Sequence, residues 1–159
     1  MFFLICAAPA LAQGTAISFG SSEHDGNLPV EVTSEELDVD QSTGIAVFTG
    51  DVLVIQGEMR LFAERVTVEY TPQSTDDSGG INRVLANGEV TIVRGPEAAE
   101  GDDAVYTLAT GMVVMTGDVM VTQGPNVVLG DRLSVNLDDG AGVVEGNVKT
   151  IFQPAGASE

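Results

Sequence analysis

Acidic residues at regular spacing are the first candidates for chemistry in this chain of 159 residues. Asp51, Glu89 and Asp118 each follow the glycine of a repeated Gly-acid-Val phrase, and a fourth copy of the phrase carries Asn147 instead. Two carboxylates that flank a sugar bond can hydrolyse a glycoside. In a strand, however, alternate side chains point to opposite faces, so the acid of each phrase faces away from the apolar residues. In addition, one of the four copies of the phrase has an amide in place of the acid. We therefore interpret these side chains as solvent-facing and predict that the protein is not an enzyme.

The sequence also lacks the residues that nucleophilic catalysis or a known calcium-binding motif would need. A catalytic serine or cysteine needs a base, yet the chain has a single histidine, His24, and a single cysteine, Cys6, both near its start. Neither the twelve-residue EF-hand loop nor the glycine-rich nonapeptide that binds calcium occurs in the sequence. We predict no cofactor and no metal site.

The elements that carry the acids form an internal repeat. The Gly-acid-Val phrases have their glycines at positions 50, 88, 117 and 146, and a second phrase begins with small residues at 34, 63, 101 and 130. Both series have a period of 29 residues and one longer step of 38, where residues 71–80 read as an inserted loop. Repeats of this kind indicate units that bury their apolar faces against their neighbours.

Alternating apolar and polar residues predict strands. Around the first phrase, Phe48, Gly50 and Val52 lie on one face, whereas Thr49 and Asp51 lie on the other. A glycine inside an inward row usually marks a bulge or a sharp bend. Four glycines at matching positions therefore predict an all-β domain whose sheet curves repeatedly around an apolar interior, either an ordinary core or a lipid-lined cavity.

Composition and the chain ends predict where the protein works. The net charge of −18, from 24 acidic and six basic residues, argues against nucleic acid as a partner. Residues 1–12 read as a signal peptide, because an apolar run leads into the small-x-small pattern Ala10-Leu11-Ala12. We expect a flexible lead-in at 13–28, one domain at 29–153 and a flexible tail at 154–159. Export without disulfides fits the bacterial periplasm.

Three stretches resemble the LptA/OstA-like (organic solvent tolerance protein A-like) family of periplasmic lipopolysaccharide-transport proteins. They are residues 29–40 (PVEVTSEELDVD), 46–52 (AVFTGDV) and 63–66 (AERV), and the similarity extends over about residues 29–153. The resemblance implies a curved, open β-jellyroll of many short antiparallel strands, built here from a unit of about 29 residues. It also implies lipopolysaccharide (lipid A) as the ligand, with three partners: an LptC-like inner-membrane protein, the N-terminal domain of an LptD-like outer-membrane protein, and head-to-tail copies of the chain.

In this reading the interior shields the acyl chains of lipid A, while the sugars and phosphates stay in solvent. The residues expected to line the interior are Phe48, Val52, Val54, Val66, Val68, Val90, Ile92, Tyr106, Met115, Val119, Val121, Leu133 and Val135. The basic residues are scattered: Arg60, Arg65, Arg83, Arg94, Arg132 and Lys149. Two alternatives remain open: a structural adhesin or matrix protein with a dry, filled interior, and an LptC-like or LptD N-terminal-like module of the same fold.

The ends of such a stack predict how copies associate. A sheet that does not close leaves an unpaired strand at each end, here near residues 29–32 and 148–152. Unpaired edges invite further strands. We therefore expect the last strand of one copy to pair with the first strand of the next.

Overall fold

The fold is all-β. The computed structural model describes residues 14–19, 25, 27–71 and 80–154, and in these residues the regular structure consists of eleven strands. The strands are β1 (Thr15–Ser18), β2 (Glu31–Thr33), β3 (Glu36–Asp40), β4 (Ile45–Gln56), β5 (Met59–Tyr70), β6 (Ile81–Arg94), β7 (Glu97–Thr107), β8 (Met112–Gln123), β9 (Asn126–Asn136), β10 (Ala141–Glu145) and β11 (Lys149–Ile151). This part of the chain contains no helix that is long and apolar enough to cross a membrane.

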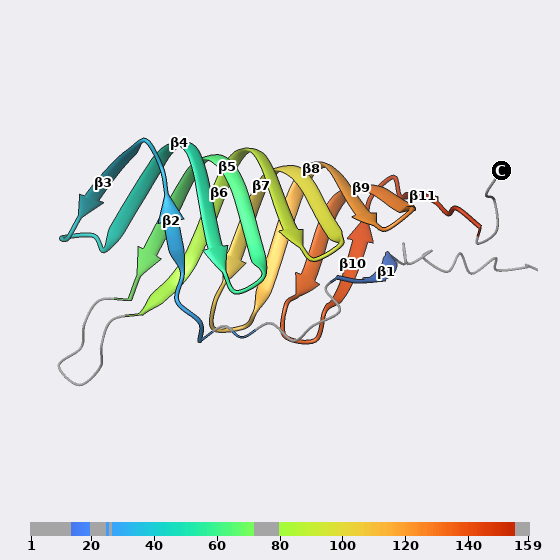
Figure 1. The fold of residues 1–159 in the computed structure, drawn as a ribbon, viewed down its shortest axis with the longest axis horizontal. Helices are drawn as coiled ribbons and strands as arrows, with labels where there is room; N and C mark the ends of the chain where they lie inside the picture. The colour runs from blue at the N-terminus through green and yellow to red at the C-terminus, as the bar shows by residue number, and fades with distance from the viewer. Residues whose placement is uncertain (1–13, 20–24, 26, 72–79, 155–159) are drawn as a thin grey trace, which may run out of the picture.

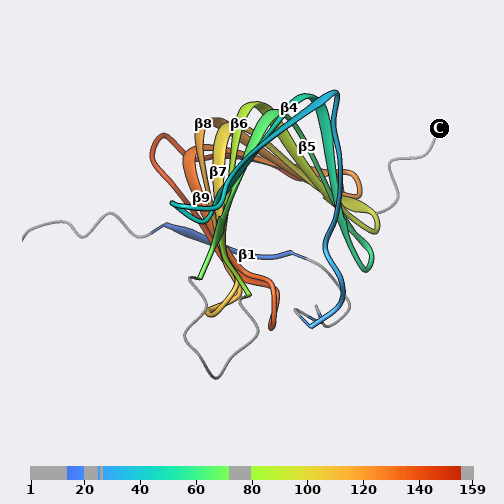
Figure 2. The ribbon, with the colours of Figure 1, turned by 90° about the vertical axis from the view of Figure 1, so that its left-hand side faces the viewer.

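All eleven strands belong to one antiparallel, open sheet. Strands β4 to β10 form a meander, β2 and β3 both pair with β4, β10 and β11 both pair with β9, and β1 pairs with β10. The long strands arch over the interior of the molecule and descend on both sides as two arms (Figures 1 and 2). The turns after β4, β6 and β8 lie along the edge of one arm, which we call the first rim. The turns after β3, β7 and β9 lie along the edge of the other arm, the second rim.

The arch forms because the chain bends at the repeated phrase. Each bend has two successive residues with positive φ, and the second is not a glycine. The pairs are Gly50 (86°) and Asp51 (43°), Gly88 (84°) and Glu89 (47°), Gly117 (84°) and Asp118 (43°), and Gly146 (79°) and Asn147 (48°). At the first bend the register with β5 shifts between Thr49 and Val52, which is the signature of a β-bulge. The predicted repeated curvature is confirmed, and the bulge is its cause.

The second repeated phrase explains why the bend position is a glycine. Its acids, Glu35, Glu64, Asp102 and Asp131, each lie over the bend glycine of the next unit. A methyl group added to Gly88 would come within 2.9 Å of the Cβ of Glu64, and one added to Gly117 would come within 2.7 Å of the Cβ of Asp102. The two interleaved phrases of the sequence are therefore neighbours in space, and each bend is covered by an acidic side chain.

The inward faces of the strands form the core. Val52, Val119 and Val121 are buried, whereas Thr49 and Asp51 are exposed, as the strand period predicts. Asp118 is likewise exposed. The buried apolar residues make one continuous cluster, and Phe48 packs against it half-buried.

The start of the chain differs from the sequence prediction. Residues 15–18, which fall in the expected flexible lead-in, form β1 and extend the sheet beyond β10. The next residue, Phe19, is fully buried, and its backbone N–H donates to the carbonyl of Gly140 at 2.6 Å. Pairing with a distant strand gives this short segment its structure. The predicted signal peptide at 1–12 and most of the inserted loop (72–79) lie outside the described residues, as does the tail from 155 on.

Candidate functional site

The apolar interior is the candidate site, and the structure brings its predicted residues together. Of the thirteen residues expected to line it, twelve are buried and Phe48 is half-buried. They come from alternate positions of β4 to β9, so that all point to the inside of the arch.

Strand register arranges the inward side chains into rows that run across the strands, along the length of the molecule. On the arm that ends in the first rim, one row consists of Val32, Val54, Leu61, Ile92, Ala99, Val121, Val128 and Thr150. On the other arm, a matching row consists of Leu37, Phe48, Val66, Ala86, Ala104, Met115, Leu133 and Val144. Neither row contains a charged residue. The interior therefore presents two stripes that are apolar throughout β4 to β9.

Sequence reasoning missed several members of these stripes. Leu61 and Val128 are buried and directly oppose Ile92 and Val121 in the sheet. Both continue the alternation of their strands beyond the repeated phrases, and this is the signal that would have identified them. Phe19 had no comparable signal, because its segment shows no sustained periodicity.

A polar row follows the first rim on the same inward face. Register places Gln56, Met59, Arg94, Glu97, Gln123 and Asn126 in sequence along it. Gln56 is 1% exposed and Arg94 is 3% exposed, which makes them the buried polar side chains of the described chain. This row marks the border between the apolar stripes and the edge of the arm.

Two hydrogen bonds from the polar row cross between the arms, and a third binds the segment that precedes β2. Nη1 of Arg94 donates to the carbonyl of Leu137 on the second rim at 3.1 Å. The hydroxyl of Tyr106 donates to Oε1 of Gln56 at 3.4 Å, and Nε2 of Gln56 donates to the carbonyl of Leu28 at 3.0 Å. Burial raises the pKa of the Tyr106 phenol, and the negative charge of Asp138 raises it further. The side chains that close the arch are therefore polar.

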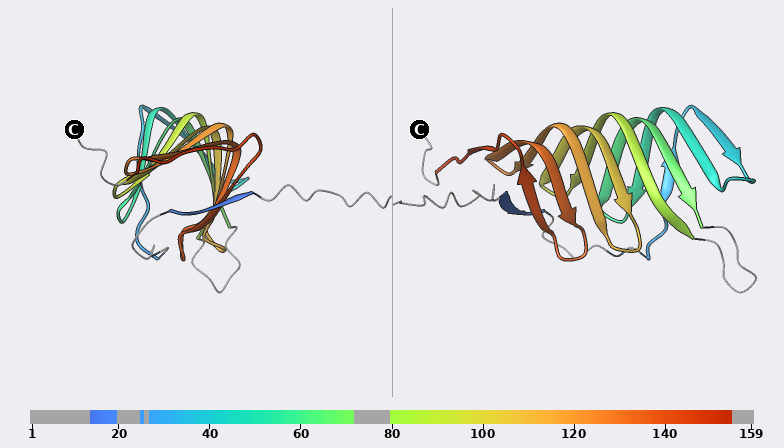
Figure 3. Two further views of the ribbon diagram at one scale, coloured as in Figure 1. Left: turned by 90° about the vertical axis from the view of Figure 1, so that its right-hand side faces the viewer. Right: turned by 180° about the vertical axis from the view of Figure 1, so that it is seen from behind.

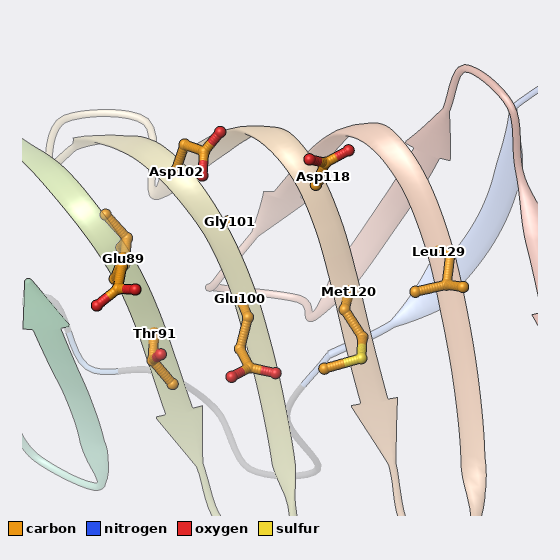
Figure 4. Close-up of a pocket in the computed structure, with 9 residues that line it drawn as sticks. Glu89, Thr91, Glu100, Gly101, Asp102, Asp118, Met120 and Leu129 are labelled. Carbon is orange, nitrogen blue, oxygen red and sulfur yellow. The ribbon is translucent and has the colours of Figure 1, made fainter.

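The outer face of the bends carries a second hollow of a different character. A groove of about 630 Å³ lies over β6 to β9, and its lining includes the four acids Glu89, Glu100, Asp102 and Asp118 (Figure 4). No basic side chain contributes to the groove, and the rest of its lining is Val90, Thr91, Gly101, Met120 and Leu129. Among the residues that the structure describes, no group of three or more His, Cys, Asp or Glu side chains is arranged to hold a metal ion. The negative charge of this groove repels anions.

Apolar side chains are exposed at both ends of the sheet. On β3, Leu37 is 51% and Val39 is 60% exposed, although both belong to inward rows, because β3 is an outermost strand. At the opposite end, Ile151 of β11 is 48% and the following Phe152 is 73% exposed. These ends lie far apart along the long axis of the molecule (Figures 1 and 3).

Comparisons with known proteins agree with this architecture. Residues 31–141 match the family described as LptA/(LptD N-terminal domain) LPS transport protein. An uncharacterised protein of Rhizobium meliloti (strain 1021), R00383, is 29% identical over 114 residues, which are 70% of this chain and 61% of that protein. The chain thus spans less than two thirds of the length of this relative.

A solved structure has the same fold. The crystal structure of LptH from Pseudomonas aeruginosa superposes with a TM-score of 0.71 at 21% sequence identity, covering 82% of this chain and 99% of that one. LptH is described as the LptA-homologous periplasmic component of the conserved lipopolysaccharide transport device. At this level of identity the similarity shows the fold, an open β-jellyroll, as the sequence predicted.

Proposed function

The chain belongs to the LptA/(LptD N-terminal domain) family of LPS transport proteins, and from this premise we propose that it is a periplasmic carrier of lipopolysaccharide. In this proposal the acyl chains of lipid A lie along the two apolar stripes, while the sugars and phosphates remain outside the arch. Membership in a family of transport proteins also means that the chain is not an enzyme.

The observation that carries the proposal is the pair of uninterrupted apolar stripes. They extend through six successive long strands, and their residues are inward-facing in each of them. Each methylene group of an acyl chain that leaves water contributes about 0.8 kcal/mol. In the structure the inward side chains pack on one another, so an acyl chain would replace these contacts as the arms move apart. A carrier that exchanges one set of apolar contacts for another can both take up its lipid and release it.

Binding of purified lipids tests the proposal. The protein is titrated with lipopolysaccharide and with the same lipopolysaccharide from which the acyl chains have been removed by alkaline hydrolysis. We expect saturable binding of the intact lipid and no binding of the deacylated form. An adhesin or matrix protein with a permanently filled interior would bind neither form, and a sugar-binding protein would bind both.

The exposed ends support a role in a bridge between the two membranes. An edge strand with exposed apolar side chains can accept a strand from another protein and bury those side chains in the process. We propose that β2 and β3 at one end and β11 at the other pair with further copies of the chain. The terminal copies would pair with an LptC-like inner-membrane protein and with the N-terminal domain of an LptD-like outer-membrane protein. A contact of this head-to-tail kind does not close on itself, so it builds a filament.

A further inference from the structure

Arg94 is the one cation in the interior of an otherwise very acidic protein. The chain has six Lys and Arg residues, and the other five are exposed. Arg94 is only 3% exposed and lies two positions after the buried Ile92, on the same inward face of β6. A buried charge is costly unless it is paired, so its presence needs a physical reason.

The contacts of Arg94 leave part of its binding capacity unused. Nη1 donates to the carbonyl of Leu137, but Nη2 is buried and has no acceptor among the described residues. Arg94 is in neither of the two ion pairs found in the described chain. Its strand neighbour Glu97 accepts a hydrogen bond from Nε2 of Gln123 at 3.4 Å. Nη2 of the guanidinium is therefore without an acceptor, and its neighbour Nη1 is held only by a neutral carbonyl.

The position of Arg94 is where the head and the chains of an amphiphile must meet. Its bond to Leu137 joins the first rim to the second and closes the arch there, on the side away from the bends. A lipid with its chains inside and its head outside has to place the linkage between them in the gap between the rims. Arg94 lies at this border, with the apolar stripe on its inner side. Any charged group at the base of the lipid head would come close to it.

We propose that Arg94 is an anion-binding residue, whose guanidinium exchanges the Leu137 carbonyl for a phosphate group on the head of the bound lipid. The fork of N–H groups in arginine matches two oxygens of a phosphate at once, and such charge-assisted pairs are stronger than a bond to a neutral carbonyl. The carboxylates of the outer groove repel the same phosphate, so the charge distribution directs it to the gap between the rims. This inference rests on the proposed function, because it assumes that acyl chains occupy the interior.

The test compares one lipid with and without its phosphates. The probes are hexa-acylated, bis-phosphorylated lipid A and the same lipid after enzymatic dephosphorylation, each titrated into the wild type, Arg94→Met and Arg94→Lys. Arg60→Met is the matched control, because Arg60 lies on the adjacent strand, opposite Val93, and is exposed. The Arg60→Met variant also removes one positive charge, but from the outer face of the arch. Unfolding of each variant is measured in parallel, and Arg94→Met should be at least as stable as the wild type because methionine fills the space without a buried charge.

We expect the wild type and Arg60→Met to prefer the phosphorylated lipid by about tenfold or more, the strength of a charge-assisted hydrogen bond. Arg94→Met should bind both lipids equally, and Arg94→Lys should keep part of the preference. An unchanged preference in Arg94→Met would overturn the inference. Failure of the wild type to bind either lipid would instead refute the proposed function, and the inference with it.

Inorganic phosphate, added as a competitor, distinguishes two sources of the anion. If it abolishes the preference without weakening the binding of dephosphorylated lipid, Arg94 also takes up free phosphate. If it has no effect, the acyl chains are needed to bring the phosphate to Arg94. In the first case the effect of phosphate should be absent in Arg94→Met, and an effect that persists in this variant would contradict a site at Arg94. In the second case the loss of lipid preference in Arg94→Met is the evidence for the site.

Discussion

The packing of an acidic side chain over each bend glycine predicts a specific loss of stability when a methyl group is added there. Gly117 has a φ of 84° and lies under Asp102, whereas Gly124, in the turn after β8, has a φ of 57° and no atom within 4 Å of an added Cβ. Alanine at either position must adopt a left-handed conformation. Only at position 117 does the new methyl group also collide with a neighbour.

The two contributions have different sizes. The left-handed conformation costs a residue with a Cβ about 1–2 kcal/mol, and this is the whole expected effect of Gly124→Ala. At Gly117 the added Cβ would come within 2.7 Å of both Cβ and Cγ of Asp102. Because a Cβ is fixed to its backbone, the strand itself must shift, which adds roughly 1–3 kcal/mol. For a chain of this size, each kcal/mol lowers the melting temperature by about 2–4 °C.

Urea and thermal unfolding of the single and double variants check this reasoning. Gly117→Ala should be less stable than Gly124→Ala, and Asp102→Gly should recover the difference because it removes the colliding Cβ. In a double-mutant cycle the two changes should therefore couple by about 1 kcal/mol or more. Strict additivity of Gly117→Ala and Asp102→Gly, or equal losses in the two alanine variants, would refute the packing argument.

Three further predictions concern the interior, the edges and the inserted loop. Above a pH of about 10 the tyrosines of the unfolded chain ionise, whereas the raised pKa keeps Tyr106 neutral in the folded protein. The free energy of unfolding of the wild type therefore falls relative to that of Tyr106→Phe, by at most about 1.4 kcal/mol per pH unit. Urea unfolding of both proteins across this range measures the loss, and a constant difference would contradict it. Thr150→Pro removes an N–H from the edge strand β11 and should weaken self-association. Salt should strengthen the self-association of the wild type, because it screens the net charge of −18. Sedimentation that finds a strict monomer or a closed dimer at every salt concentration would contradict the filament. Replacing residues 71–80 by a short turn should preserve cooperative unfolding, and its loss would show that the loop belongs to the core.

The repeat made much of the fold predictable from the sequence. A glycine in an inward row usually indicates a bulge or a bend, so four such glycines predicted the curvature. The alternation of apolar and polar residues before and after each glycine predicted which side chains face inward. The acid of the second phrase was visible too, but its position over the glycine was not, since pairing between strands is a non-local property. The same limitation explains β1: Ile17 and Phe19 alternate only briefly, and their structure comes from the distant β10.

The site shows the same division between local and non-local information. Alternation identified the apolar lining, because each buried residue lies two positions from another one. Arg94 also follows this alternation after Val90 and Ile92, yet a charged residue at the end of a strand is usually exposed. Only the fold shows that the end of β6 lies opposite the turn after β9, so that Arg94 is buried between the two rims.

Site-specific photocrosslinking along β8 tests the central claim, that the interior of the arch holds the lipid, most directly. A photoreactive amino acid is placed in turn at the inward positions 113, 115, 119 and 121 and at the outward positions 114 and 120, in cells that make lipopolysaccharide. After irradiation, adducts are detected by blotting for lipopolysaccharide. We predict adducts at the four inward positions and none at the two outward ones. Adducts of equal strength on both faces, or on the outer face alone, would contradict the account.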